Sequence, residues 1–208
     1  MLQQNPEKFN FQIDRRRFIA ESNLIDKQDD YLGRIIPGEK PGDPMYVRHE
    51  RAMDLYPILA ARRPVSASVV LDLHRELTRG IDAFELRSLS GVYRTERRSV
   101  NYHPLPEPHL VSDYVDRLLV PRLREALSTR AALPQDALKQ AWFCHDLFEC
   151  IHPFHDGNGR TGRLLLDLIL YAQQRPGVVV LYDDRKKYYR KIQTFRDAVF
   201  KQLISASD

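Results

Sequence analysis

The chain has 208 residues, of which 43% are hydrophobic and 29% are charged. This length is typical of one domain with at most a short extension, and the hydrophobic content excludes an intrinsically disordered chain. Lys and Arg number 32 against 28 Asp and Glu, which gives a formal net charge of +4. So mild an excess suits an enzyme that binds a polyanionic ligand about as well as it suits a nucleic-acid-binding protein.

The sequence contains no recognisable membrane or export segment. The longest strongly apolar stretch, Leu164 to Tyr171, is interrupted by Asp167 and is far shorter than the ~20 residues that span a bilayer. Residues 1–11 lack the apolar core of a signal peptide. Cys144 and Cys150 have no known metal or redox spacing, so we expect buried thiols. We expect a cytoplasmic protein, with export as an effector left open.

Helical patterns follow one another along most of the chain. The first, about Pro6 to Ile25, precedes a Gly- and Pro-rich stretch from Gly33 to Met45 that is typical of a linker. The remaining helices are predicted over 66–79, capped by Ser66 and ended by Gly80, over 109–129, with a break or restart at Pro121, and over 134–150, 158–174 and 184–205.

The segment from Arg94 to Pro106 lacks the helical period. It contains Val100 and Tyr102 and ends in a proline-rich run over 104–108. These features favour an irregular β-hairpin. The predicted fold class is therefore all-α, a helical bundle that carries one short hairpin.

The most informative segment, HPFHDGNGRTGR, lies between two predicted helices. Gly157 and Gly159 let the backbone approach a ligand closely and aim successive amides in one direction, which favours an anion. The helix that starts near Asn158 adds the positive end of its dipole, and Arg160 and Arg163 follow three residues apart. Together these features predict a cradle for two or three phosphates.

Two further side chains of this segment suggest its chemistry. Asp156 precedes the cradle and would repel phosphate unless a divalent cation lay between them, and Mg²⁺ is usually held by one or two carboxylates together with phosphate oxygens. His152, at the end of the preceding helix, is the natural general base near neutral pH. We expect it to deprotonate a hydroxyl group that attacks a phosphorus atom.

A transition-metal site is the first alternative. Five side chains have spacings that suit such a metal: His145, Glu149, His152, His155 and Asp156. The adjacent His and Asp are similar to the pair of metal phosphohydrolases. That interpretation leaves the glycine turn and Arg163 without a role.

A nucleic-acid-binding surface is the second alternative. The segment from Arg185 to Lys191 has five cations in seven residues, and Tyr188 and Tyr189 lie within it. A single short basic run in a mildly charged chain is more often a solvated helix face. Nucleic acid is therefore not an expected partner.

Residues 152–163 resemble the signature of the Fic (filamentation induced by cAMP) family, H-P-F-x-[D/E]-G-N-G-R-x-x-R, at every specified position. Residues 91–95, followed by His103 and Pro106, look like the family's flap hairpin, which clamps the target segment beside the phosphates. The run from Arg185 to Tyr189 resembles the family's R-x-x-Y-Y stretch near the nucleotide base.

This resemblance covers about Ser66 to Phe200. It implies two parts of the chain: an N-terminal helical segment with a linker over 1–60, and a catalytic domain over 61–208. The activity it implies is that of a protein adenylyltransferase, which transfers AMP from ATP to a Ser, Thr or Tyr hydroxyl of a target protein and releases pyrophosphate. A transferase with another donor, an enzyme that removes AMP, and a catalytically silent nucleotide-regulated module are the alternatives, and a homodimer stays open.

The resemblance also implies a role for each matched residue. These roles are His152 as the base; Asp156 as the Mg²⁺ ligand; Gly157, Asn158, Gly159 and Arg160 as ligands of the donor phosphates; Arg163 as ligand of the terminal phosphate; Tyr188 and Tyr189 on the side of the base; and Arg97, Arg98, Ser99 and Val100 in docking of the target.

Many members of the family contain an inhibitory helix with the pattern [S/T]-x-x-x-E-[G/N], whose Glu pairs with the second arginine of the signature. This chain has no complete match, but SNLIDK is similar to it, with Ser22 at the first position and Asp26 in place of Glu. Asp is one methylene shorter than Glu, and Lys27 replaces the small residue. The resemblance therefore implies a weakened inhibitory contact between Asp26 and Arg163.

Overall fold

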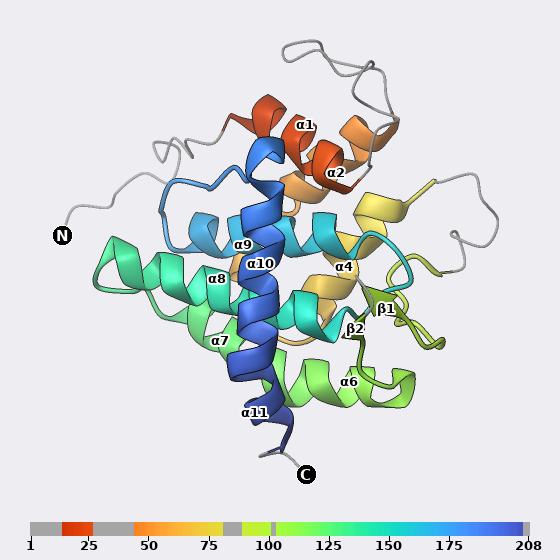
Figure 1. The fold of residues 1–208 in the computed structure, drawn as a ribbon. Coiled ribbons are helices and arrows are strands. Elements are labelled where there is room, and N and C mark those ends of the chain that lie inside the picture. The colour runs from red at the N-terminus through yellow and green to blue at the C-terminus, as the bar shows by residue number, and fades with distance from the viewer. Residues whose placement is uncertain (1–13, 27–43, 81–88, 101–102, 206–208) are drawn as a thin grey trace.

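The computed structural model describes residues 14–26, 44–80, 89–100 and 103–205 (Figure 1). Its α-helices are α1 (Arg15–Asp26), α2 (Pro44–Asp54), α3 (Tyr56–Ala61), α4 (Ser68–Thr78), α6 (Val111–Tyr114), α7 (Val120–Ser128), α8 (Pro134–Ile151), α9 (Asn158–Ala172), α10 (Arg185–Phe195) and α11 (Lys201–Ser205). Short 3₁₀ segments are η2 (Pro108–Leu110) and η4 (Tyr182–Asp184), and π-helical segments are η3 (Val115–Leu119) and η5 (Arg196–Phe200). The strands within this part of the chain are β1 (Ser99–Val100) and β2 (His103–Pro104).

The bundle is built around α9. Every residue from Arg160 to Leu170 is buried, because α9 packs against α8 on one side and against α1, α2, α3 and α4 on the other. A helix surrounded on all sides has no solvent face, so its sequence is apolar around most of its circumference. Its charged exceptions, Arg160, Arg163 and Asp167, are therefore the residues that need an explanation.

The prediction of an all-α fold is confirmed. The helices predicted over 134–150 and 158–174 are observed as α8 and α9, and the one predicted over 184–205 is observed as the continuous column α10, η5 and α11, which crosses in front of α8 in Figure 1. The helix expected over 66–79 is α4, and it ends before Gly80, whose φ of 73° lies in the left-handed region.

The helical run around Pro121 continues without a break, which differs from one of our two expectations. Residues 108–128 are helical throughout, and η3 immediately precedes α7, in whose first turn Pro121 lies. Proline lacks an amide hydrogen and clashes with the carbonyl group four residues earlier. The wider π-helical turn before Pro121 accommodates both effects, so the helix restarts in place.

The expected hairpin is also observed. β1 and β2 pair antiparallel, with Ser99 opposite Pro104 and Val100 opposite His103. The strands are two residues long, consistent with an irregular hairpin rather than a sheet.

The N-terminal helices pack directly on the central bundle. α1 contacts α2, α9 and η4. Residues 6–13 of the first predicted helix and most of the Gly33–Met45 stretch lie outside the described residues, and the division of the chain at residue 60 stays a prediction. Within the described residues no helix is both long and apolar enough to cross a bilayer. Cys144 and Cys150 are free and buried as expected, and burial raises the pKa of each thiol to about 12.

Candidate active site

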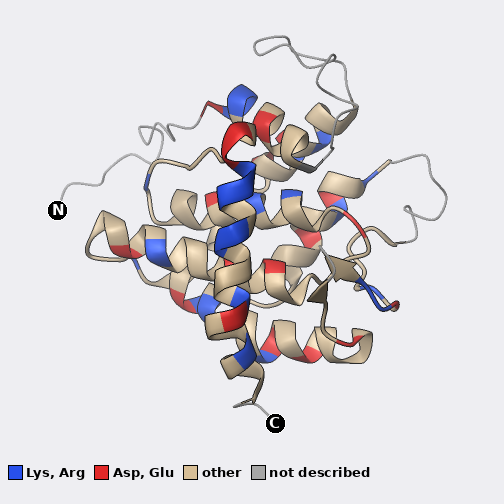
Figure 2. Ribbon diagram, in the orientation of Figure 1, with Lys and Arg blue, Asp and Glu red and all other residues tan. Residues whose placement is uncertain are grey.

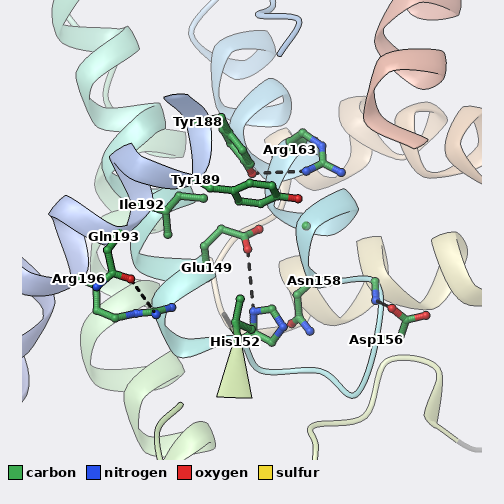
Figure 3. A pocket seen from close by; sticks show the side chains of 13 residues that line it. Glu149, His152, Asp156, Asn158, Arg163, Tyr188, Tyr189, Ile192, Gln193 and Arg196 are labelled. Carbon is green, nitrogen blue, oxygen red and sulfur yellow. Dashed lines mark hydrogen bonds and ion pairs between the residues drawn. The ribbon is translucent and has the colours of Figure 1, made fainter. Parts of the chain in front are cut away.

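A cavity of about 220 Å³ lies where the C-terminus of α8, the N-terminus of α9, α10 and the hairpin meet (Figure 3). Its lining contains most of the residues that the sequence singled out. These are His152, Asp156, Gly157, Asn158, Gly159, Arg163, Tyr188, Tyr189 and Val100, together with Glu149, Ile192, Gln193 and Arg196.

His152 terminates α8 in a left-handed conformation, with φ 51° and ψ 62°. This conformation is uncommon for a residue with a side chain and persists only where the surroundings impose it. The His152 amide donates to the Phe148 carbonyl at 2.8 Å, and the His152 carbonyl accepts from Arg94 Nε at 2.8 Å. The main chain is thus held on both sides of the Cα, and the imidazole is held at the cavity.

Glu149 lies one turn before His152 and faces the same cavity. Its Oε2 atom is 3.9 Å from His152 Nδ1, a separation at which the carboxylate stabilises a protonated imidazole (Figure 3). Gly162 makes this position accessible, because a Cβ atom there would lie 2.2 Å from Glu149 Oε1. Sequence analysis considered Glu149 only as a metal ligand; its spacing three residues before the expected base was the signal for a supporting role.

The loop between α8 and α9 is held by its own side chains. Asn158 Oδ1 accepts from the Phe154 amide at 2.9 Å, and Asn158 Nδ2 donates to the Phe154 carbonyl at 2.8 Å. The side chain of Asn158 therefore fixes the loop, and its main-chain amide at the start of α9 is the group it offers to an anion. Asp156 Oδ1 accepts from the Gly157 amide at 2.7 Å, and Gly157 has a φ of 77°.

His74 of α4 supports the same loop from below. Its Nδ1 accepts from the Gly91 amide at 2.9 Å, which leaves the hydrogen on Nε2 to be donated to the Asp156 carbonyl at 2.9 Å. The ring stacks on Phe154 at 3.7 Å between centroids. Burial lowers the pKa of His74 to about 4, which keeps this ring neutral. Sequence analysis did not identify His74 because its contacts are distant in sequence.

Arg94 connects the hairpin to the catalytic loop. Besides the His152 carbonyl, its guanidinium donates to the carbonyls of Glu96 at 3.0 Å and Pro106 at 2.7 Å, and its amide donates to the Pro153 carbonyl at 2.8 Å. It is 2% exposed. The base of the hairpin and the His152 loop are therefore one hydrogen-bonded unit.

The flap residues divide into two groups. Val100 of β1 lines the cavity, and Ser99 precedes it on the strand. Arg97 is exposed and bonded to Glu107 at 2.8 Å, whereas Arg98 contacts the ring of His155. Figure 2 shows that charged residues of both signs lie in the loop before β1. The two arginines are therefore outside the cavity, on the approach to it.

The two signature arginines separate, although we expected both beside the cradle. Arg163 lines the cavity. Arg160 is absent from the lining; its side chain is 6% exposed, and its Nη2 atom lies 3.5 Å from Asp156 Oδ2. Arg160 also lowers the pKa of the buried ring of His49, after the larger effect of burial itself. Three residues on a helix differ by about 60° in direction, which is enough to send the two side chains to different places.

Arg163 is held by two different helices. Its Nε donates to Ser22 Oγ at 2.8 Å and its Nη2 donates to the Ser22 carbonyl at 2.8 Å, both on α1. Its Nη1 donates to Tyr188 Oη of α10 at 3.4 Å. The predicted inhibitory motif thus reaches Arg163 through Ser22, and the side chain of Asp26 lies outside what the structure describes.

The base-side residues lie on α10. Tyr188 is buried, and Tyr189 is partly exposed with its hydroxyl donated to the Ile25 carbonyl at 3.2 Å. Sequence analysis missed Ile192, Gln193 and Arg196, which continue the same lining. Helical spacing from Tyr188 places positions 192 and 196 on one face, and this was the available signal.

The cavity offers few protein side chains that could hold a metal ion. Among the described residues no three His, Cys, Asp or Glu side chains gather to hold one. His145 bonds to Tyr188 and His155 to Arg98, so the five-residue transition-metal set is not assembled. The Asp156 carboxylate is 61% exposed beside the α9 N-terminus, which suits Mg²⁺ bound jointly with phosphate oxygens.

Comparison with known proteins agrees with these features. The profile of the Fic/DOC family matches residues 64–170. "Protein adenylyltransferase Fic" of Aedes aegypti is 29% identical over 135 residues, 65% of this chain and 25% of that protein. "Protein adenylyltransferase Fic" of Drosophila ananassae is 30% identical over 131 residues, 63% of this chain and 24% of that protein. The chain thus spans about a quarter of the length of these curated relatives.

Solved structures share the fold. A Fic domain containing signaling protein from Bacteroides thetaiotaomicron superposes with a TM-score of 0.67 at 19% identity, covering 86% of this chain and 70% of that one. Fic-1 from C. elegans superposes with a TM-score of 0.58 at 22% identity, covering 85% of this chain and 54% of that one. With the matched profile and the shared helical bundle, the chain belongs to the Fic/DOC family.

Proposed function

We propose that the protein transfers AMP from ATP to a Ser, Thr or Tyr hydroxyl of a target protein. One observation carries this proposal: a single cavity contains the His152 imidazole, the N-terminus of α9 and the Arg163 guanidinium. A general base, an amide cradle and a fixed cation are the groups that nucleotidyl transfer requires. The relatives named protein adenylyltransferase support the choice of reaction.

His152 acts on the attacking hydroxyl. The imidazole takes the hydroxyl proton while the oxygen forms a bond to the α-phosphorus of ATP, and the bond from that phosphorus to the bridging oxygen breaks. Pyrophosphate leaves with the electron pair. Glu149, 3.9 Å from Nδ1, stabilises the imidazolium that forms, so the proton is held at Nε2 until release.

The start of α9 and Arg163 bind the phosphates. The amides of Gly157, Asn158 and Gly159 lie at the positive end of the α9 dipole, where anions are stabilised. Arg163 grips the terminal phosphate, and the bond from its Nη1 atom to Tyr188 Oη fixes the direction of the guanidinium. When bound, Mg²⁺ would be held by Asp156 with phosphate oxygens and would neutralise charge that develops on the leaving group.

Ser22 restrains this activity. It occupies two of the guanidinium nitrogens of Arg163, which a terminal phosphate would otherwise use. Release of α1 from α9 therefore precedes tight binding of the terminal phosphate. Ser22 is the first residue of the motif from which an inhibitory contact is expected, and the contact expected for Asp26 stays a prediction because its side chain lies outside the described residues.

The test uses ATP labelled at the α-phosphate and, separately, at the γ-phosphate, with the protein alone and with cell lysate. With the isolated protein we expect label from α-labelled ATP only, and with lysate we expect more label from α-labelled ATP than lysate alone incorporates. His152→Ala should lower its incorporation by about 10²- to 10⁴-fold, the usual contribution of a general base. His109→Ala, an exposed histidine on η2, is the matched control and should leave it unchanged.

A panel of α-labelled GTP, CTP and UTP identifies the donor, because preference for one of these would replace ATP in the proposal. Label from γ-labelled ATP on the isolated protein would indicate phosphoryl transfer. Equal incorporation by wild type and His152→Ala would overturn the assignment of the base.

A further inference from the structure

Behind the cavity, polar side chains form a continuous chain from α10 through α8 to Arg163, buried except at Lys191, where it begins. Lys191 bonds to Asp146 Oδ2, and Asp146 Oδ1 lies 2.8 Å from His145 Nδ1. His145 Nε2 lies 2.9 Å from Tyr188 Oη, which in turn accepts from Arg163 Nη1 at 3.4 Å. No step of the proposed transfer uses His145 or Asp146.

Between Asp146 and Arg163, these two groups fix which atom donates each hydrogen bond and which accepts it. A carboxylate only accepts hydrogen bonds and a guanidinium only donates them. Asp146 therefore requires a hydrogen on His145 Nδ1, which leaves Nε2 as an acceptor. Tyr188 must then donate its hydrogen to His145, so the oxygen lone pairs of Tyr188 are directed at Arg163.

The chain lies in a setting where a wrong orientation is costly. His145 is 0% exposed, Asp146 3% and Tyr188 5%. The ring of Trp142 contacts the ring of His145 edge-on at 5.0 Å. Burial lowers the pKa of His145, which favours the neutral ring that this arrangement needs. An unmade hydrogen bond in such surroundings costs more than one at the surface.

We propose that His145 is a positioning residue for Arg163, acting through the hydroxyl of Tyr188. The inference rests on the proposed function only for the identity of the phosphate that Arg163 binds. Ser22 leaves Arg163 whenever α1 is released, and Tyr188 then continues to hold the guanidinium toward the cavity. Oriented Tyr188 is therefore part of the active state, whereas Ser22 is part of the restrained one.

Two histidine substitutions separate positioning from packing. His145→Gln places an amide oxygen where Nε2 accepts, and His145→Asn places an amide nitrogen where Nδ1 donates but does not reach Tyr188. We expect His145→Asn to weaken binding of Mg-ATP by about 3- to 10-fold, the usual effect of one hydrogen bond, and His145→Gln to stay within about twofold of wild type. Isothermal titration measures both.

A double-mutant cycle with Tyr188→Phe tests the route of the effect. Tyr188→Phe keeps the ring and removes only the hydroxyl, so it should weaken Mg-ATP binding as much as His145→Asn. Adding His145→Asn to Tyr188→Phe should cause no further loss. Additive losses, or equal losses in His145→Gln and His145→Asn, would overturn the proposal.

A nuclear magnetic resonance measurement decides the positioning even if the protein bound no nucleotide. We expect the ¹⁵N spectrum of the His145 ring to show a hydrogen on Nδ1 and none on Nε2. The resonance of the Arg163 Nη1 group, which bonds to Tyr188, should shift in Tyr188→Phe and His145→Asn and keep its wild-type position in His145→Gln. A His145 ring protonated on Nε2, or an Arg163 resonance unchanged in all three variants, would refute the positioning role of His145 while leaving the proposed function standing.

Discussion

Arg163 and Asp167 are both buried and lie one turn apart on α9, but they differ in their hydrogen-bonding partners and in their ionisation. Arg163 is 1% exposed and Asp167 is 0% exposed. Arg163 donates hydrogen bonds to Ser22 and Tyr188 and faces the cavity. Burial raises the pKa of Asp167 to about 8, and the Tyr56 hydroxyl and the Arg15 guanidinium only partly oppose this.

The difference shows that position on a helix does not decide whether a buried ionisable side chain is charged. A charge taken out of water persists only where hydrogen-bonding partners replace the water, and otherwise the group becomes neutral. Arg163 has such partners from α1 and α10. Asp167 is a neutral acid at pH 7, and its contribution is to packing around α9 rather than to the chemistry of the cavity.

Replacing Asp167 gives the largest expected change. The unfolded-state pKa of 3.8 lies below the folded-state pKa of about 8, so between these values the folded protein holds a proton that the unfolded chain has released. The free energy of unfolding therefore falls as the pH rises from about 4 to 8, by up to about 1.4 kcal/mol per unit. Asp167→Asn should remove this slope and be the more stable protein at pH 8.

Urea unfolding of Asp167→Asn and wild type between pH 4 and pH 9 measures this slope. Asp183→Asn, an exposed aspartate, is the matched control. Parallel curves for Asp167→Asn and wild type would show that Asp167 is ionised in the fold. Transfer of AMP at pH 7 should be the same in both proteins.

Replacing Arg163 should have the reverse pattern, with a large loss of activity and little loss of stability. Arg163→Met keeps most of the volume and removes the cost of burying a charge, which offsets part of the loss of the hydrogen bonds to Ser22 and Tyr188. We expect AMP transfer to fall by about 10²-fold, as for loss of one group that stabilises developing charge. Steady-state rates measure the loss of activity, and urea unfolding measures the change in stability.

If Arg163→Met unfolded at a much lower urea concentration than wild type but transferred AMP at the wild-type rate, the contrast with Asp167 would be lost. Both arginine and aspartate would then be structural residues of the core. Arg163→Lys keeps the charge but cannot bond to both Ser22 and Tyr188, so it should retain only part of the wild-type rate of AMP transfer.

Weakening the hold of α1 on Arg163 gives the smallest effect, with the opposite sign. Ser22→Ala removes the bond to Nε and keeps the bond from Nη2 to the main-chain carbonyl. A single hydrogen bond changes an equilibrium by about 2- to 10-fold, so AMP transfer should rise by that factor. The measurement is the initial rate of label incorporation at subsaturating ATP.

Arg17→Ala, an exposed residue on the same helix, is the control for general loosening of α1. Asp26→Ala tests the inhibitory contact that the sequence predicts. A rise in Asp26→Ala with none in Ser22→Ala would assign the restraint to the aspartate rather than to the serine.

Much of this architecture could be predicted because local rules determine it. The period of apolar residues gives α8 and α9, and Pro134 and Gly80 mark a beginning and an end. Local rules left open whether the helix breaks or restarts at Pro121, because the compensating turn depends on packing along η3. His74 and Arg94 were missed because their partners are distant in sequence, and no spacing rule connects them.

The sequence by itself determined the helical class, the hairpin and the chemical groups of the signature, since periodicity, turn residues and a twelve-residue motif are local properties. Only the tertiary structure decided which groups meet. It brought Ser22 and Tyr188 to Arg163, turned Arg160 toward Asp156, and buried Asp167 so that its pKa rises. The physical reason is that burial and hydrogen-bonding partners are set by elements that pack together from separate parts of the chain, and these decide the charge and direction of each side chain.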